Sequence, residues 1–251
     1  MKTILACRPS CAGRFVANRL AEAGLLDGLI LESGAIARRR KLERMKRGKG
    51  WLGIARVYID AAALMVYGRW FEHRLARSST APRGWNDFPP GLPRIEVADI
   101  NETRSRDFLR EQGCEVLVVL GTGILGEATI DVPSRFVLNI HGGRVPAYRN
   151  VHCDFWAFRR RDFENIGTAI LYLDRGIDSG DVAIQESISW QPGDALFEIK
   201  QKNLQLSGEL IERAIRQAEQ GTLPRTRQEG EEAGFHPTPG LFDLLWALRH
   251  G

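Results

Sequence analysis

Cysteine is scarce in this sequence, and its placement argues against a zinc site. Cys7, Cys11, Cys114 and Cys153 include no pair with the C-x-x-C spacing that zinc ligands use. We therefore expect a reduced, cytoplasmic chain, since structural disulfides belong to oxidising compartments. A redox pair of Cys7 and Cys11 is the alternative.

Long apolar runs are also missing. Polar residues 8–10 interrupt the first apolar run, so the N-terminus lacks the hydrophobic core of a signal peptide. The longest apolar stretch, residues 54–67, is shorter than the roughly 20 residues that span a bilayer, and it contains Arg56 and Asp60. We expect no transmembrane segment. No internal repeat is visible, and 251 residues suffice for one α/β domain with a core.

Charge is unevenly distributed. The net charge is +4, but residues 38–49 alone hold eight cations against one acid, Glu43, which leaves −3 for the rest. One interpretation is a solvated helix face or a loose insertion. The other is a patch that binds an anion, such as a nucleotide, a phosphorylated substrate or an anionic membrane surface.

Strand-like and helix-like segments alternate along the chain. Short apolar runs typical of strands occupy residues 3–7, 29–31, 93–97, 115–120, 135–140, 167–173 and 181–184. Helical spacing occupies residues 14–23, 35–77, 102–112 and 195–220, and a loop rich in Ser, Pro and Gly covers 78–93. This alternation predicts an α/β fold of the Rossmann-like kind, with a mostly parallel, doubly wound sheet.

The same pattern suggests how the chain is organised. We expect one main domain over residues 1–190, with a basic helical insertion at about 35–78 after the second strand. Residues 191–251 would form a long helix and a short tail that packs on the domain or on a partner. The apolar segment LFDLLWAL, residues 241–248, is a candidate homodimer contact.

A glycine motif comes directly after the strand at 115–120. Residues 121–126, GTGILG, match the dinucleotide fingerprint G-x-G-x-x-G. The motif comes late in the domain, a strand is expected soon after it, and Pro146 stands where the acidic residue should be. We therefore interpret it as a glycine-rich turn at the carboxyl edge of the sheet, where α/β proteins place their ligands, and an NAD-binding oxidoreductase is a remote alternative.

Two polar residues end the strand at 135–140. Asn139 and His141 lie two apart, so a strand would point both side chains to the same side. Together they could stabilise an oxyanion, and the imidazole could transfer a proton near neutral pH. The loop at 173–181, LDRGIDSGD, could supply a carboxylate to orient His141. The plain alternatives are a structural strand end and a polar turn.

Four separated motifs resemble one family. They are N-I-H at 139–141, PAYR at 146–149, Trp156-Ala157, and GTAILYLDRGIDSGDV at 167–182. Their order and spacing resemble the formyltransferase superfamily that uses 10-formyltetrahydrofolate. Its members act on glycinamide ribonucleotide, methionyl-tRNA or amino sugars. The resemblance covers about residues 115–185, and the N-terminal third is similar only in being α/β.

The resemblance implies a catalytic trio of Asn139, His141 and Asp178. An amine of the acceptor would attack the formyl carbon, while Asn139 and protonated His141 stabilise the developing oxyanion. Asp178 would hold His141 in its charged form and help to relay the amine proton. No metal is implied.

The resemblance also implies where the folate binds. The apolar contact for the pterin would come from Gly123, Ile124 and Leu125. The backbone of residues 173–177 would pair with the pterin's polar edge, and the residues expected there are Leu173, Asp174, Arg175 and Gly176. Glycine suits such a site because it lets the backbone approach a flat ring closely.

This sequence departs from the family at two places. Many members have Ser-Leu-Leu-Pro after the histidine, whereas this chain has Gly-Arg-Val-Pro at 143–146, so Arg144 introduces a charge. The subsequent Arg-Gly of the family is Arg149-Asn150 here.

The acceptor is inferred from the length and composition of the chain beyond the core. About 65 residues come after Glu186, too few for the RNA-binding barrel expected of a methionyl-tRNA enzyme. The basic window has few aromatic residues to stack bases, so no nucleic acid partner is expected. We expect N-formylation of a small amine, most naturally a phosphorylated or nucleotide-linked amino sugar whose diphosphate would meet cations. Glycinamide ribonucleotide, an amino acid acceptor, hydrolysis of formyltetrahydrofolate and a non-catalytic binding protein are the alternatives.

Overall fold

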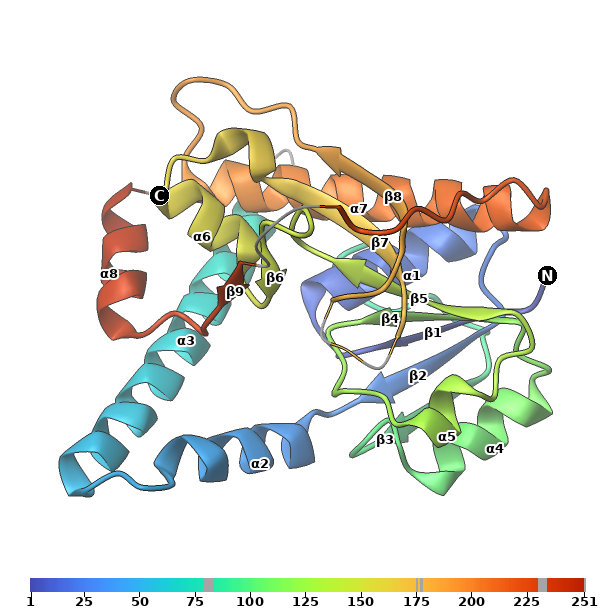
Figure 1. The fold of residues 1–251 in the computed structure, drawn as a ribbon, viewed down its shortest axis with the longest axis horizontal. Coiled ribbons are helices and arrows are strands. Elements are labelled where there is room, and N and C mark those ends of the chain that lie inside the picture. Colours follow the sequence, from blue (N-terminus) through green and yellow to red (C-terminus); the bar gives the residue numbers. More distant parts are fainter. Residues whose placement is uncertain (79–83, 175, 177, 230–233, 251) are drawn as a thin grey trace.

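The structure is a computed structural model that describes residues 1–78, 84–174, 176, 178–229 and 234–250. Its centre is a seven-stranded sheet in the order β3-β2-β1-β4-β5-β7-β8 (Figure 1). The strands are β1 (Thr3–Cys7), β2 (Gly28–Glu32), β3 (Arg94–Val97), β4 (Val116–Leu120), β5 (Phe136–His141), β7 (Gly167–Tyr172) and β8 (Val182–Ser187). The first five in chain order are parallel, β7 runs antiparallel to its neighbour β5, and β8 runs antiparallel to β7. The mostly parallel α/β sheet is thus confirmed.

Helices bury both faces of this sheet. Helices α1 (Cys11–Glu22) and α7 (Leu196–Glu219) lie on one face, and α4 (Thr103–Glu111) and α5 (Glu127–Ile130) lie on the other (Figure 1). Leu5 of β1 packs in the α1–α7 core, whereas its neighbour Ile4 packs in the α4 core. Successive side chains of a strand thus enter opposite cores. Because a strand covered on both faces has no polar side, its sequence is an unbroken apolar run.

The basic insertion forms two helices, of which the first leads away from the sheet and the second returns toward α6 (Figure 1). Helix α2 (Ala35–Lys46) leads into the 27-residue helix α3 (Trp51–Arg77). By length and composition alone, α3 could cross a membrane, although its apolar stretch at 54–67 is shorter than a bilayer span and contains Arg56 and Asp60. Helices α8 (Leu241–His250) and α6 (Cys153–Arg159) pack around the second half of α3 in one apolar cluster.

A small second sheet brings the chain's end back to the main sheet. Strands β6 (Arg149–Asn150) and β9 (Phe235–His236) pair in parallel, and Thr226 forms a bridge with Val182 of β8. The short 3-10 helix η1 (Phe163–Asn165) precedes β7. Residues far apart in sequence therefore meet beside the end of β5.

Two local predictions need correction. Helix α1 starts at Cys11 rather than Arg14, because the Ser10 side chain caps it by accepting the Gly13 N–H at 3.2 Å. The sequence predicts only a glycine-rich turn before the next strand, whereas the four-residue helix α5 starts directly after Gly126. The Pro133 turn and β5 then follow, so α5 is a single turn.

Candidate active site

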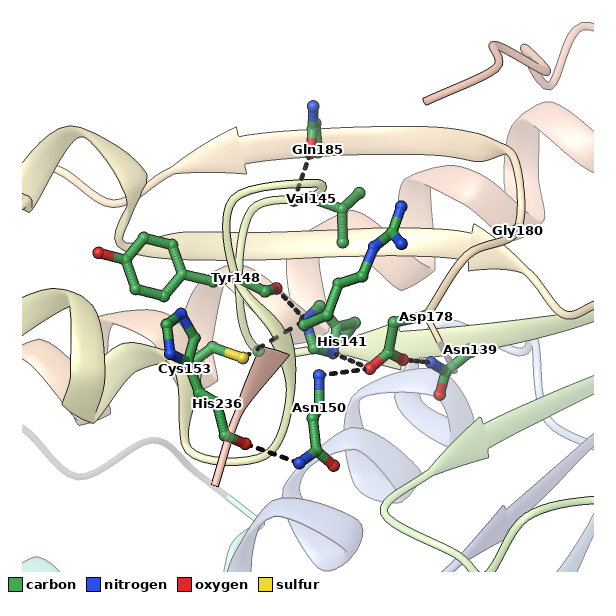
Figure 2. A network of polar contacts seen from close by, with 12 residues as sticks. Asn139, His141, Val145, Tyr148, Asn150, Cys153, Asp178, Gly180, Gln185 and His236 are labelled. Atoms are coloured by element: carbon green, nitrogen blue, oxygen red, sulfur yellow. Dashed lines mark hydrogen bonds and ion pairs between the residues drawn. The ribbon is translucent and has the colours of Figure 1, made fainter. Parts of the chain in front are cut away.

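Asn139 and His141 lie at the carboxyl end of β5, on the same side of the strand. Both pair with β7, Asn139 opposite Leu171 and His141 opposite Ala169. The Asn139 amide donates to Oδ1 of Asp178 at 3.0 Å, and Nδ1 of His141 lies 3.4 Å from Oδ2 of the same carboxylate. Figure 2 shows Asp178 between the two side chains. The structure therefore brings together the three residues that the sequence singles out.

Hydrogen bonds fix both the side chain and the backbone of Asp178. The backbone N–H of Asn150 donates to Oδ2 at 2.9 Å. The Gln228 side-chain amide donates to the backbone carbonyls of Asp178 and Gly180, each at 2.8 Å. Asp178 has a φ of 49°, a conformation that Asp and Asn adopt more readily than most residues. The carboxylate is thus fixed in position by segments from both sides of the site.

His141 is nearly buried, at 5% exposed, and both its ring nitrogens face acceptors. Nδ1 faces the Asp178 carboxylate, and Nε2 lies 2.8 Å from the carbonyl oxygen of Tyr148. A neutral imidazole has one N–H, whereas the imidazolium has two and satisfies both oxygens. The arrangement therefore suits a charged histidine paired with Asp178.

Cys153 is a further neighbour of the histidine, with its Sγ 3.6 Å from Nε2 (Figure 2). Burial raises the pKa of the Cys153 thiol, and the charges of Asp154 and Asp178 raise it further. The thiol therefore stays protonated near neutral pH, which is unlike the exposed, electropositive setting of a nucleophilic cysteine. Cys153 packs against His141 as a small neutral side chain.

Gly143 makes this close packing possible. A Cβ at Gly143 would overlap Cβ of Cys153 and would lie 3.1 Å from Nε2 of His141. At Gly142 the nearest atom to such a Cβ is 3.7 Å away. Only the second of the two glycines is therefore required for its lack of a side chain.

The two departures from the family have structural explanations. Asn150 has a φ of 79°, which glycine adopts freely and asparagine tolerates better than most residues, so Asn can stand where the family has Gly. Its side chain donates to the His236 carbonyl at 2.6 Å. Arg144 reaches the Glu164 carbonyl and the Ser187 hydroxyl, each at 3.3 Å. Arg144 therefore interacts with η1 and β8, and not with the Asp178 carboxylate.

The first expected folate loop, Gly123 to Leu125, is fixed by two polar side chains. Fully buried Glu32, at the end of β2, accepts the Gly123 N–H at 2.8 Å. The Asn101 side chain accepts the Gly126 N–H at 2.6 Å and donates to the Ile124 carbonyl at 2.9 Å. Ile124 itself is 69% exposed and Leu125 is buried. The loop thus presents one apolar side chain on a rigid backbone, which suits contact with a flat ring.

The second expected folate loop is only partly available. Leu173 packs on the same apolar cluster as Leu125. The N–H of Leu173 already donates to the Val137 carbonyl, and the N–H of Gly176 donates to the Asp174 carboxylate, each at 2.9 Å. These two donors are therefore not free for a pterin in this conformation. Arg175, also expected here, and position 177 lie outside the described residues.

Sequence reasoning missed four groups that shape the site: the Tyr148 carbonyl, the Asn150 N–H, Gln228 and Glu32. The first two are backbone groups and have no sequence signal. Glu32 has one, because an acid that ends the apolar run LILE is unusual in a buried strand. Within the described part of the chain, no group of three His, Cys, Asp or Glu residues is placed to hold a metal ion.

Comparison with known proteins places this geometry in context. The formyl transferase family matches residues 94–215, which include the whole Asn139–His141–Asp178 network. A methionyl-tRNA formyltransferase from Thermotoga sp. (strain RQ2) is 28% identical over 155 residues, 61% of this chain and 49% of that protein. The chain thus spans about half the length of the curated relatives it matches.

Solved structures share the fold. A sugar N-formyltransferase from a Shewanella species superposes with a TM-score of 0.57 at 15% identity, covering 100% of this chain and 89% of that one. An N-formyltransferase from Helicobacter canadensis, in complex with folinic acid and dTDP-3-aminofucose, gives 0.55 at 12% identity, covering 94% and 71%. Residues 94–215 thus match the formyl transferase family, and the chain shares the α/β fold of these formyltransferase structures.

Proposed function

We propose that this protein transfers the formyl group of 10-formyltetrahydrofolate to a primary amine. The observation that carries the proposal is the contact of Asp178 with both Asn139 and His141 at the end of β5. An amide and an imidazolium beside one carboxylate provide two donors for an oxyanion and one acceptor for a proton. A family match over the same residues supports the same chemistry.

Each residue of the trio has a role in this reaction. The amine nitrogen forms a bond to the formyl carbon and loses a proton, and the folate nitrogen that leaves gains one. Asn139 uses one amide hydrogen on Asp178 and has a second for the formyl oxygen. Asp178 keeps His141 charged and accepts the amine proton. For Nε2 of His141 to donate to substrate, its contact with the Tyr148 carbonyl must be exchanged.

We propose a nucleotide-linked amino sugar as the acceptor. The H. canadensis neighbour, which has the same fold, holds such a sugar nucleotide together with a folate. The sequence relatives instead act on methionyl-tRNA, but this chain matches only about half of their length. Glycinamide ribonucleotide and amino acids remain the alternative acceptors. The catalytic domain at 1–190, a cytoplasmic location and a homodimer stay predictions.

The direct test is transfer from 10-formyltetrahydrofolate to UDP-, GDP- and dTDP-linked amino sugars, with mass spectrometry of the product. We expect His141→Ala to lower kcat by at least about 100-fold, as is common when an oxyanion donor or general acid is removed. His73→Ala is the matched control, because His73 is exposed on α3. Near-normal transfer by His141→Ala would contradict the catalytic assignment, and binding of NADH in place of a folate analogue would contradict the proposed function.

A further inference from the structure

Helix α3 exposes an apolar face that the rest of the described chain does not cover. Six large side chains on it are at least 49% exposed: Trp51, Leu52, Tyr58, Ile59, Met65 and Val66. They form two rows with a spacing of seven residues, or about two helical turns, so they share one side of the helix. Val57 and Tyr67 are buried on the side that faces the protein. An uncovered face of this size marks an interaction surface.

Helix α8 lies beside the second half of α3 and also exposes apolar side chains (Figure 1). Its Leu244 and Ala247 pack in one cluster with Tyr67 of α3, whereas Phe242, Leu245 and Leu248 are 76%, 48% and 48% exposed. The exposed three are spaced by three residues, which places them on one side of α8.

The acid within the apolar part of α3 is directed into the protein. Asp60 accepts the N–H of Leu241, the first residue of α8, at 2.7 Å, and it lies 3.8 Å from Nε of Arg56. Asp60 thus fastens α8 to α3, and its negative charge is partly neutralised. The exposed face of α3 consequently has no exposed acid between Trp51 and Phe71.

Cations lie next to this apolar face. Arg39, Arg47 and Lys49 are exposed, and Lys49 is two residues from Trp51. Lys46 lies 5.3 Å above the ring of Tyr58, so α2 is folded onto the start of α3. Residues 38–49 have a charge of +7, which is the strongest local charge in the sequence. Apolar side chains beside a dense group of cations are typical of helices that lie in the surface of an anionic membrane.

We propose that α3 and α8 dock the protein on the surface of an anionic lipid membrane, with the cations of α2 on the phosphate headgroups. The exposed apolar rows would enter the boundary between headgroups and acyl chains, where Trp51 and Tyr58 fit well. This docking does not depend on the proposed formyl transfer. It would bring the enzyme close to acceptors carried at a membrane.

The structure favours surface docking over two other arrangements. In a two-fold dimer the same surface would face itself, so the cations of one α2 would lie in the field of the other. If α3 spanned the bilayer, its contacts with α2 and α8 would be lost and Arg56 and Asp60 would enter the hydrocarbon. Surface docking keeps these contacts and explains both the apolar rows and the cations.

The test is flotation of the full chain with vesicles. We expect it to float with vesicles of equal parts phosphatidylglycerol and phosphatidylcholine, to bind pure phosphatidylcholine weakly, and to be released by salt. Replacing the exposed cations should weaken binding by on the order of 100-fold, at about fivefold for each cation. These substitutions are Arg39→Ala, Arg47→Ala and Lys49→Ala. The matched control removes three exposed cations elsewhere, by Arg94→Ala, Arg104→Ala and Arg110→Ala, and should bind as wild type.

A second variant tests the apolar rows and carries Leu52→Ser, Ile59→Ser and Val66→Ser. It should lose about tenfold in vesicle binding for each side chain, with unchanged circular dichroism. Sedimentation velocity on the same proteins tests self-association. The proposal is overturned if wild type fails to float while the Ser variant converts a dimer to a monomer. It is also overturned if the protein resists alkaline carbonate extraction from membranes, which would indicate a spanning α3.

Discussion

At the scale of the residue, the site depends on how closely the chain packs against His141. Gly143 lies where any side chain would reach both Cys153 and His141. The neighbouring Gly142 has room for a methyl group. The two glycines after the histidine look alike in the sequence, and only the structure distinguishes them.

Alanine substitutions at Gly143 and Gly142 should therefore have different effects. Gly143→Ala should destabilise the fold by about 1–3 kcal/mol through overpacking and should lower kcat as His141 is displaced. Gly142→Ala should change both by much less. Denaturant unfolding and transfer kinetics on the two variants measure this. Equal effects at both positions would show that His141 is not held by this contact.

Side chains were predicted from the sequence better than backbone groups. Asn139 and His141 follow from the period of a strand, and Asp178 follows from its motif. The Tyr148 carbonyl and the Asn150 N–H could not be predicted, because every residue carries such groups and only tertiary structure places them. Glu32 was overlooked because it ends an otherwise apolar run, and its partner Gly123 lies in a turn 91 residues further on.

At the scale of the element, the segment after α7 completes the site. Thr226 pairs with Val182 of β8, which places the Gln228 amide on the carbonyls of Asp178 and Gly180. Arg149 in turn donates to the Gln228 side chain at 2.5 Å. Strands could be recognised in the sequence by their apolar runs, whereas this segment is polar and was seen only as a tail.

We predict that Gln228 positions Asp178. Gln228→Leu should lower kcat by about tenfold or more while KM for the folate changes little, since the loop that carries Asp178 would lose two hydrogen bonds of about 1 kcal/mol each. Arg227→Ala is the control, because that side chain is exposed. A normal pH–rate profile and normal kcat in Gln228→Leu would show that the loop holds its own shape.

At the scale of the whole molecule, a buried ion pair joins α6 to α7 and so links the site to the helix that covers the sheet. Nζ of Lys200 lies 2.8 Å from Oδ2 of Asp154, and each side chain is 14% exposed. Burial alone would raise the pKa of Asp154, but the attraction and hydrogen bond of Lys200 outweigh it and hold that pKa below its ordinary 3.8. Burial likewise opposes the charge of Lys200, and Asp154 nevertheless raises its pKa above 10.5.

The pair makes stability depend on pH in a defined way. The contribution of the pair to the free energy of unfolding is fully present at pH values between the ordinary pKa of an aspartate and that of a lysine. It is lost as the pH falls through the lowered pKa of Asp154, and it is lost as the pH rises through the raised pKa of Lys200. Lys200→Met should cost about 3–5 kcal/mol at neutral pH, because it leaves a buried carboxylate without its cation.

The pH profile of Lys200→Met is the measurement that isolates the pair. In the variant, protonation of Asp154 relieves the penalty, so the difference from wild type should narrow as the pH is lowered. The double variant that adds Asp154→Leu should recover part of the loss at neutral pH. A difference that stays constant with pH would mean that the lost packing of the lysine stem, and not the charge, destabilises the protein.

The pairing of β6 with β9 has a consequence for how the protein is made. Asn150 holds Asp178 through its N–H and is itself held by the His236 carbonyl. During translation, the seven strands of the main sheet are all synthesised before residues 226–236. The main sheet can therefore form while Asp178 still lacks part of its support, so the proposed site is completed only in the last stage of synthesis.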